Sequence, residues 1–494
     1  MNLNYLTRFN LLFICLLGTL LRVIYAYYYT PWRFAPDHLA WESMIRAGGF
    51  SYAELIHYPH EGGTILVSLL GKFIGLFTAF DSLTLSALLL DFISRYIQLY
   101  IVSKTFPVKV TLVFGLWSIF ASPSSIPWGS LNFGMHAVSG SFPFLLFYVF
   151  QKNTGTLRFY LLSAVFMGLA VWFSYNNMVL LPAYLVLCFA TNDKLRYKLY
   201  ALLCFGAILF VHILVRVFAD AGFHLEQIPL DSIRDTSFSL HDSETWKHLY
   251  KLWTNALADS SVAARHSPYF LAPLKYLWIT LVALGLMAFA RTKLPGLTSG
   301  SKFALYLMVF VFLLVYAISP FYYEGKEISN HVAYRHLCYI LPLLSLLVIA
   351  GLNHLRAGFV LWSLYLMFAV YGCLLLFTQK PPQGNGEKAA GWVICKKTGH
   401  DPQKVQAVIQ GSSLDHSLLY QGIGWGMSSA LFENVEANNK AVFEKRLQEF
   451  KTLYMAYPKE HRDELKEGAK FSFGDGITPV LDKAILEQLL KELE

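Results

Sequence analysis

A succession of long apolar segments runs through most of this chain and limits what it can fold into. Twelve such segments lie near residues 9–29, 64–80, 82–101, 110–126, 137–151, 159–174, 178–191, 199–218, 271–290, 303–319, 337–352 and 357–377. A helix of about twenty apolar residues is long enough to cross the hydrocarbon core of a bilayer. Only 15% of the residues are charged, whereas soluble domains average roughly 25%. The chain is therefore predicted to be an all-α polytopic membrane protein. The first segment lacks a signal-peptide cleavage site, so we expect it to remain as a membrane anchor.

The segment at 64–80 differs from the other eleven. It is short, rich in glycine and carries Lys72 near its middle, which suits a helix lying in the membrane interface better than one crossing it. The positive-inside rule favours the same interpretation. With this segment interfacial, the short cytoplasmic connections hold eleven basic residues: Lys104, Lys109, Lys152, Arg158, Lys194, Arg196, Lys198, Arg291, Lys293, Lys302 and Arg356. The short outer connections hold only Lys326 and Arg335. We therefore predict about eleven transmembrane helices, with the N-terminus cytoplasmic and the C-terminus outside.

The composition changes after residue 379, where the breaker sequence PPQGNG leads into a polar region with helical periodicity. We predict a membrane domain over residues 1–379 and a mainly helical soluble domain over 380–494 on the non-cytoplasmic side. Within the second domain, the stretch at 420–431 has the glycines of a helix-packing contact or a loop. No catalytic pattern is found there, so a structural or partner-binding role is expected. The net charge of +8 is spread over the cytoplasmic connections and not gathered into one patch, which argues against nucleic-acid binding.

Titratable residues gather where the first apolar segment ends. The stretch that follows it carries Asp37, His38, Glu42, Glu54, His57, His60 and Glu61. Ionisable groups at the mouth of a membrane bundle are costly to hold near hydrocarbon and therefore indicate a functional site. Two further outer segments, 122–136 and 319–336, are expected to face the same side.

The order of these parts resembles the GT-C superfamily of membrane glycosyltransferases, in particular its dolichyl-phosphate-mannose-protein mannosyltransferase-like and ArnT-like branch. The matching parts are Arg22 late in the first span, Pro36-Asp37-His38, the helix-forming LAWESMIRAGG, and HYPHEGGTILVSLLGKFIGLF leading into the interfacial segment. HVAYRHLCYILPLLSLLVIAGL at 331–352 is similar to the Arg-Tyr-rich sequence before a late span in that branch. This chain has Asp37-His38 where the family commonly has Asp-Glu. The resemblance covers roughly residues 9–377 and implies a GT-C-like bundle.

The resemblance also implies an enzyme that takes a sugar from a polyprenyl-phosphate carrier at the outer face of the membrane. It would pass the sugar, usually with inversion, to a hydroxyl of a lipid, glycan or protein. Asp37 is the expected general base, because a carboxylate can take the proton of an acceptor hydroxyl, and His38 is grouped with it. The leaving phosphate needs positive charge and hydrogen-bond donors. Residues expected to bind the donor phosphate or substrate are Arg22, His57, His60, Glu61, Lys72, Lys326, Arg335 and His336.

Each of these residues also has a simpler interpretation. Asp37 can cap the helix expected to start at His38, and Arg22 can extend its side chain to the outer interface. Arg335 can anchor a helix end at the same interface. Asp91 and Arg95, four residues apart within a span, are expected to neutralise each other.

A metal cofactor is not favoured. His57, His60 and Glu61 have ligand-like spacing on a proline-broken turn, which is a weak signal for a metal site. No acidic residue lies between Asp91 and Asp193, so the second outer segment lacks a further carboxylate.

Two other functions stay open at this point. A transporter or flippase for lipid-linked glycans would need ionisable residues along a path through the bundle, and a catalytically inactive relative would serve as a scaffold. For the enzyme we expect a bacterial-type inner membrane location, with the site and the C-terminal domain periplasmic.

Overall fold

The computed structural model describes residues 3–28, 40, 43, 62–78, 82–130, 135–153, 155–189, 194–219, 246–247, 250–251, 257–258, 272–294, 297–318, 323–324, 327–328, 336–378, 385–432, 440–471 and 491. The chain forms two compact units. Unit 1 combines Met1–Tyr29 with Pro59–Gln379, and unit 2 combines Thr30–Tyr58 with Lys380–Glu494. The segment Thr30–Tyr58, assigned from the sequence to the membrane domain, thus groups with the C-terminal residues.

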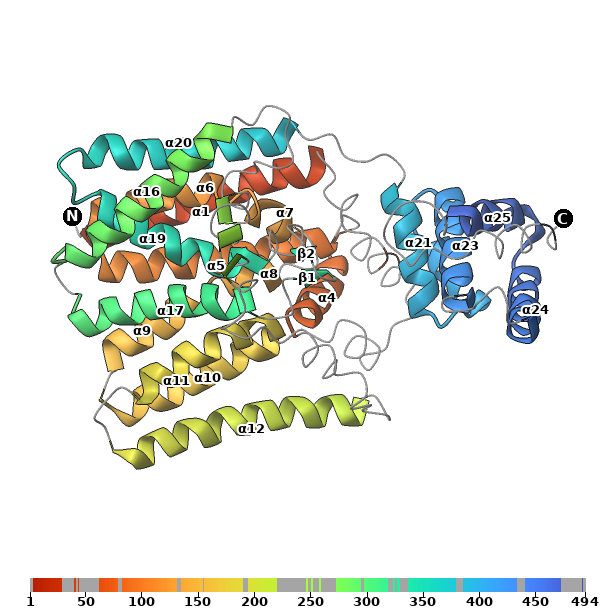
Figure 1. Ribbon diagram of the computed structural model, residues 1–494, viewed down its shortest axis with the longest axis horizontal. Coiled ribbons are helices and arrows are strands. Elements are labelled where there is room, and N and C mark those ends of the chain that lie inside the picture. Colours follow the sequence, from red (N-terminus) through yellow and green to blue (C-terminus); the bar gives the residue numbers. More distant parts are fainter. Residues whose placement is uncertain are drawn as a thin grey trace. The chain divides into compact units, whose positions relative to one another are not determined.

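Unit 1 is built from helices (Figure 1). They are α1 (Leu3–Tyr28), α4 (Gly62–Gly75), α5 (Ser82–Thr105), α6 (Val108–Phe120), α7 (Ser125–Ser130), α8 (Met135–Ser139), α9 (Phe142–Asn153), α10 (Leu157–Phe173), the 3-10 helix η2 (Tyr175–Leu180), α11 (Leu181–Phe189), α12 (Leu195–Ala219), α16 (Ala272–Arg291), α17 (Ser299–Ile318), the 3-10 helix η7 (Leu337–Tyr339), α19 (Leu341–Leu352) and α20 (Gly358–Thr378). A short antiparallel pair, β1 (Tyr323–Glu324) and β2 (Glu327–Ile328), accompanies them.

Five described helices are long and apolar enough to cross a membrane: Ser82–Thr105, Leu195–His212, Pro273–Arg291, Ser299–Tyr316 and Gly358–Thr378. Six shorter apolar helices accompany them. Each of the eleven predicted spans overlaps at least one helix. The predicted class, an all-α polytopic membrane protein with a mainly helical C-terminal region, is confirmed for the described residues. The count of eleven spans and the GT-C-like arrangement stay predictions.

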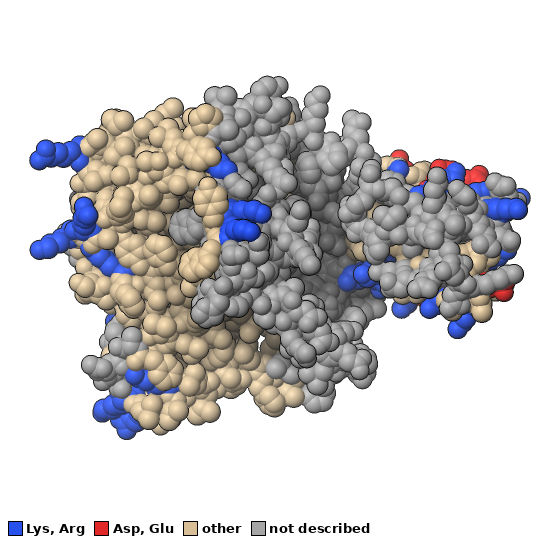
Figure 2. Space-filling view, viewed as in Figure 1, with Lys and Arg blue, Asp and Glu red and all other residues tan. Residues whose placement is uncertain are grey.

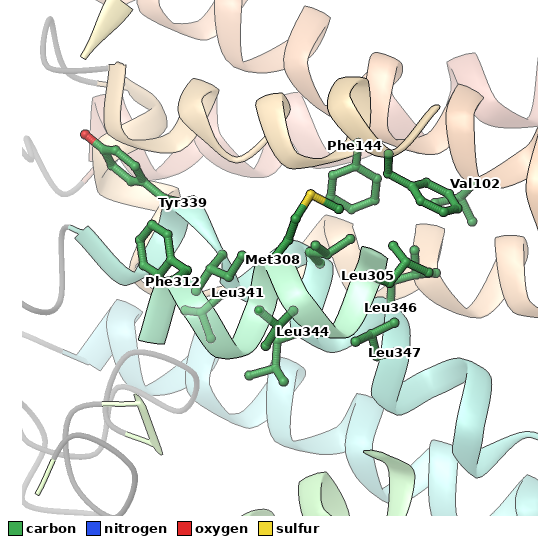
Figure 3. Close-up of a cluster of buried hydrophobic side chains, with 14 of the residues drawn as sticks. Val102, Phe144, Leu305, Met308, Phe312, Tyr339, Leu341, Leu344, Leu346 and Leu347 are labelled. Atoms are coloured by element: carbon green, nitrogen blue, oxygen red, sulfur yellow. The ribbon is translucent and has the colours of Figure 1, made fainter. Parts of the chain in front are cut away.

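Helix α19 lies at the centre of the bundle. All twelve of its residues are buried, as expected for a helix that is apolar on every face. Figure 3 shows its leucines packed with Met308 and Phe312 of α17 and Phe144 of α9. Its backbone also touches that of α16, because a Cβ added at Gly351 would lie 1.8 Å from the carbonyl oxygen of Gly285. Such close backbone approach between apolar helices requires small residues.

The two ends of unit 1 differ in charge. All eleven basic residues predicted to be cytoplasmic lie in or beside the connections α5–α6, α9–α10, α11–α12, α16–α17 and α19–α20. These connections gather at one end of the bundle, which we call the basic end (Figure 1). Figure 2 shows Lys and Arg along this edge, a few more at the opposite border of the described surface of unit 1, and no Asp or Glu on that surface in this view. We call the opposite end, which holds α7, α8, η2 and η7, the polar end.

Helix α4 is the segment predicted to be interfacial. Its 14 residues make a helix of about 21 Å, shorter than the roughly 30 Å of hydrocarbon. It packs on α5, where the Ser86 hydroxyl donates to the Val67 carbonyl over 2.6 Å. Leu66, Leu69 and Phe73 are exposed along another face. These features agree with an interfacial helix whose free face contacts lipid.

The C-terminal part of unit 2 consists of α21 (Asn385–Lys397), α22 (Pro402–Gly411), α23 (His416–Phe432), α24 (Lys440–Ala456), the 3-10 helix η8 (Lys459–His461) and α25 (Arg462–Phe471). Glycines bring three of these backbones into contact. A Cβ added at Gly422 would lie 1.9 Å from the Lys388 carbonyl oxygen, and one at Gly468 would lie 1.7 Å from that of Gln421. The predicted glycine-rich packing contact at 420–431 is confirmed.

Candidate active site

The predicted site residues divide into two groups. Asp37, His38, His57, His60, Glu61, Lys326 and Arg335 lie outside the described residues. Arg22, Lys72 and His336 are described. The roles assigned to the first group stay predictions, and the described residues show what surrounds the second group.

Arg22 belongs to a buried charged triad with Asp91 and Arg95. The Nε atoms of Arg22 and Arg95 lie 2.9 and 2.8 Å from the same Asp91 carboxylate oxygen. All three residues are at most 4% exposed. The predicted pairing of Asp91 with Arg95 is confirmed, and Arg22 of α1 is a third member that the local spacing did not indicate.

The other guanidinium donors of the triad bind backbone carbonyls and one hydroxyl. Arg22 donates to the carbonyls of Gly18, Ile119 and Ala121, and Arg95 donates to the Cys15 carbonyl and the Thr19 hydroxyl. These contacts join α1, α5 and the end of α6. A charge buried among apolar helices is stable only when paired and hydrogen-bonded, and both arginines meet this condition within the protein.

This placement bears on both interpretations of Arg22. Its side chain points into the bundle and not toward the interface, so the structure does not show the extended, interface-seeking conformation. Its guanidinium is ion-paired with Asp91, and its terminal nitrogens donate to backbone oxygens. A contact between Arg22 and a substrate phosphate stays a prediction.

His336 is held at both ring nitrogens. The side-chain nitrogen of Asn176 lies 3.1 Å from Nε2, and the Tyr316 hydroxyl lies 3.0 Å from Nδ1. Because an amide nitrogen can only donate, Nε2 accepts, and the neutral ring carries its proton on Nδ1 toward Tyr316. The imidazole is 3% exposed, so its position is fixed.

A second imidazole lies beside it. The Nδ1 atom of His136 is 2.8 Å from the Tyr339 hydroxyl, which is 2.7 Å from the Ser174 hydroxyl. The ring centroids of His136 and His336 are 5.4 Å apart, and Trp128 meets His136 edge to face. We call the six residues His136, Ser174, Asn176, Tyr316, His336 and Tyr339 the His–Tyr network. Figure 3 shows Tyr339 at one edge of the apolar cluster with its hydroxyl pointing away from it.

Two members of the His–Tyr network lie on either side of a stretch that carries predicted site residues. Tyr316 lies just before the stretch 319–335 and His336 just after it, so their hydrogen bond ties the two sides of that stretch together. Lys326 and Arg335 belong to this stretch. The predicted binding of substrate by His336 stays a prediction, and the structure shows both of its ring nitrogens bonded to protein groups.

Chemically, the His–Tyr network holds imidazole, hydroxyl and amide groups with exchangeable protons. Its imidazoles and hydroxyls can each donate or accept a hydrogen bond, and no carboxylate takes part in the contacts just described. Among the residues that the structure describes, no group of three or more His, Cys, Asp or Glu side chains could hold a metal ion. The arrangement suits proton transfer or hydrogen bonding to a polar substrate.

Lys72 lies in the last turn of α4. Its side chain is half-buried, next to the exposed Phe73. A contact between Lys72 and a donor phosphate stays a prediction.

Unit 2 anchors part of the stretch that follows the first span. Ala40 is fully buried and Ser43 is 3% exposed. The Ser43 hydroxyl lies 2.8 Å from the hydroxyl of Ser412, between α22 and α23. Ser43 is therefore bonded to the C-terminal part of the same unit.

Sequence reasoning missed most of the His–Tyr network. Tyr339 lies 203 residues from His136 and 165 from Ser174, so no local spacing links them. One signal was available. Polar side chains lie where the apolar segment 159–174 ends and the next one begins, namely Ser174, Asn176 and Asn177, and polar side chains at such a depth need hydrogen-bond partners.

No protein-family model matches the chain, and no curated protein sequence matches it. Two solved structures show a distant likeness. They are the archaeal oligosaccharyltransferase AglB from Archaeoglobus fulgidus in complex with an inhibitory peptide and a dolichol-phosphate, and the oligosaccharyltransferase of the same organism in the apo form. Each has a TM-score of 0.39 and 12% identity, over 91% of this chain. The chain spans 60% of the length of each. Likenesses this distant do not assign a function.

Proposed function

We propose that the protein is a membrane glycosyltransferase that moves a sugar from a polyprenyl-phosphate-linked donor to a lipid, glycan or protein acceptor at the outer face of the membrane. The observation that carries the proposal is the His–Tyr network at the polar end of unit 1. It includes His336 and joins the two residues that border the stretch carrying Lys326 and Arg335. It lies at the end of the bundle opposite the eleven basic residues, which the positive-inside rule assigns to the cytoplasm.

In the proposed reaction, Asp37 takes the proton of the acceptor hydroxyl while that oxygen attacks the anomeric carbon. The bond from this carbon to the donor phosphate breaks, and the lipid phosphate leaves as an anion. Lys326 and Arg335 stabilise the negative charge. Attack from the face opposite the leaving group inverts the anomeric configuration.

His336 contributes by position. Both of its ring nitrogens are bonded to protein groups, so we assign it to holding the base of the 319–335 stretch.

Transport of a lipid-linked glycan is less well supported. A transporter needs ionisable groups along a path across the membrane. The Arg22, Asp91 and Arg95 side chains are directed at one another and at backbone oxygens. His212 is bonded to the Tyr175 hydroxyl over 3.0 Å. In the part of the chain that the structure describes, these groups are engaged with protein partners.

The test is incubation of the purified protein with a panel of polyprenyl-phosphate sugars and detection of released lipid phosphate. We expect one donor to be turned over, and Asp37→Asn to reduce the rate at least about 100-fold, the lower range for loss of a general base. Glu42→Gln is the matched control in the same segment and should retain activity. No turnover with any donor would favour the scaffold function, and full activity of Asp37→Asn would remove Asp37 from the mechanism.

A further inference from the structure

A cleft opens at the basic end of unit 1, where α16 ends and α19 turns toward α20. Its volume is about 400 Å³, within the range of pockets that bind small molecules. It is lined by Leu284, Met287, Ala288, Arg291, Thr292, His354 and Leu355. This end lies opposite the His–Tyr network, so the cleft is separate from the candidate active site.

The lining changes from apolar to basic along the cleft. Leu284 and Met287 are 37% and 54% exposed, and they lie within a helix apolar enough to cross the membrane. Arg291 is the last residue of that helix, and His354 follows α19. The cleft therefore joins an apolar wall at membrane depth to the guanidinium of Arg291 and the imidazole of His354 at the membrane edge. This order matches the acyl chains and the head group of a lipid.

The carbonyl groups at the end of α16 accept hydrogen bonds from Lys302, so Arg291 is not needed to bind them. The ammonium of Lys302 donates to the Thr292 carbonyl and lies 3.5 Å from the Phe289 carbonyl oxygen. Basic side chains commonly satisfy the last carbonyls of a helix in this way. Arg291 has no ion-pair partner among the described residues, and its guanidinium is exposed.

The surroundings of the cleft carry only positive charge in the described chain. Lys293 and Arg356 flank Arg291 and His354 in the sequence. The described acidic residues of unit 1 are Asp91, which is buried in the charged triad, and Glu324 and Glu327 of the two short strands. None of them belongs to the connections of the basic end, so an anion there would meet no described carboxylate.

We propose that this cleft binds an anionic phospholipid. Arg291 holds the phosphodiester through its planar donors, as guanidinium groups do with phosphate, and His354 adds a further donor. The upper part of an acyl chain lies along Leu284 and Met287. Basic pockets between transmembrane helices at the cytoplasmic side are a known setting for anionic head groups. A zwitterionic lipid is disfavoured, because its terminal cation would face Lys293 and Arg356.

The experiment measures retention of dioleoyl phosphatidylglycerol by the purified full chain, using native mass spectrometry after delipidation. Dioleoyl phosphatidylcholine and inorganic phosphate are the comparison probes. We expect phosphatidylglycerol to bind at least about 10-fold more tightly than phosphatidylcholine, the ratio expected for one to two additional charge contacts. Inorganic phosphate should compete only weakly, because it lacks the acyl chains.

Two variants test the site itself. Arg291→Gln should reduce phosphatidylglycerol retention to the level of phosphatidylcholine, and Ala288→Phe should reduce retention of both by filling the cleft. Arg158→Gln is the matched control, since Arg158 is an exposed arginine at the same end of the bundle and does not line the cleft. Equal retention of the two lipids, or equal loss in Arg158→Gln and Arg291→Gln, would overturn the proposal. Both outcomes can be read without any transferase activity.

Discussion

The charged triad and the His–Tyr network are both buried in unit 1, yet they are built from different chemistry. The triad combines two arginines with one carboxylate, and their donors are directed at protein oxygens. The His–Tyr network is built from imidazole, hydroxyl and amide groups, and two of its members border the stretch that carries Lys326 and Arg335. The triad joins α1, α5 and the end of α6, whereas the network is proposed to hold the base of the active site. We therefore expect damage to the first to appear as lost stability and damage to the second as lost turnover.

The largest effect is expected for Asp91→Asn. This nearly isosteric change leaves two buried arginines without their counter-charge, and breaking a buried ion pair in this way lowers the free energy of unfolding by about 3–5 kcal/mol. Thermal unfolding of the purified protein measures the loss. Asp401→Asn is the control, because Asp401 caps α22 and asparagine caps a helix equally well. If the two variants unfold at the same temperature, the triad does not have the structural role given to it here.

Gly129→Ala tests the packing around the same carboxylate. An added Cβ would lie 2.8 Å from the Asp91 Oδ1 atom, and overpacking of this kind lowers stability by about 1–3 kcal/mol. Gly206→Ala is the matched control, because a Cβ there meets nothing within 4 Å. It should leave stability unchanged or raise it by up to about 1 kcal/mol. A loss in Gly206→Ala as large as that in Gly129→Ala would contradict the packing argument.

Tyr316→Phe tests the proposed functional role of the His–Tyr network. It removes the hydroxyl that binds His336, and we expect turnover to fall about 10-fold, equivalent to about 1.4 kcal/mol in the barrier. The rate of lipid phosphate release measures this. Tyr365→Phe removes a buried hydroxyl bonded to Ser345 over 2.9 Å, remote from the network. It should affect stability by a similar small amount and leave turnover intact; equal turnover in both variants would argue against the positioning role of His336.

A smaller effect, a pH-dependent change in the stability of unit 2, is expected from His400. Burial lowers the pKa of this imidazole below its ordinary value, although a hydrogen bond that the imidazole donates to the Gly399 backbone partly opposes the shift. The unfolded chain, with a pKa near 6.5, then binds more protons than the folded one. Stability is therefore full above about pH 6.5 and falls as the pH drops through that value.

His400→Asn should remove this pH dependence while keeping the backbone. His400 has a φ of 65°, and asparagine tolerates this left-handed conformation better than most residues. Hydrogen exchange of α21 and α22 between pH 5 and 8 measures the effect. An unchanged pH profile in the variant would show that another group is responsible.

The sequence predicted the features that depend on local pattern. Apolar length located the spans, the four-residue spacing identified the Asp91–Arg95 pair, and the glycines at 422, 424 and 426 indicated close helix packing. It missed Arg22 as a partner of Asp91 and it missed the His–Tyr network, because these contacts join helices far apart in the chain. The burial of Ser43 with Ser412 was missed for the same reason, since its hydroxyl partner lies 369 residues away.

The contrast between a structural charged triad and a functional His–Tyr network is tested most directly by one variant, Tyr339→Phe. Lipid phosphate release and unfolding temperature are measured on the same preparation of this variant. This variant removes the hydroxyl that lies between His136 and Ser174 and keeps the buried ring. We predict that turnover falls at least about 10-fold, equivalent to about 1.4 kcal/mol, while the unfolding temperature changes no more than in Tyr365→Phe. Turnover that is unchanged, or that falls only in proportion to the fraction of unfolded protein, would contradict a functional role for the His–Tyr network.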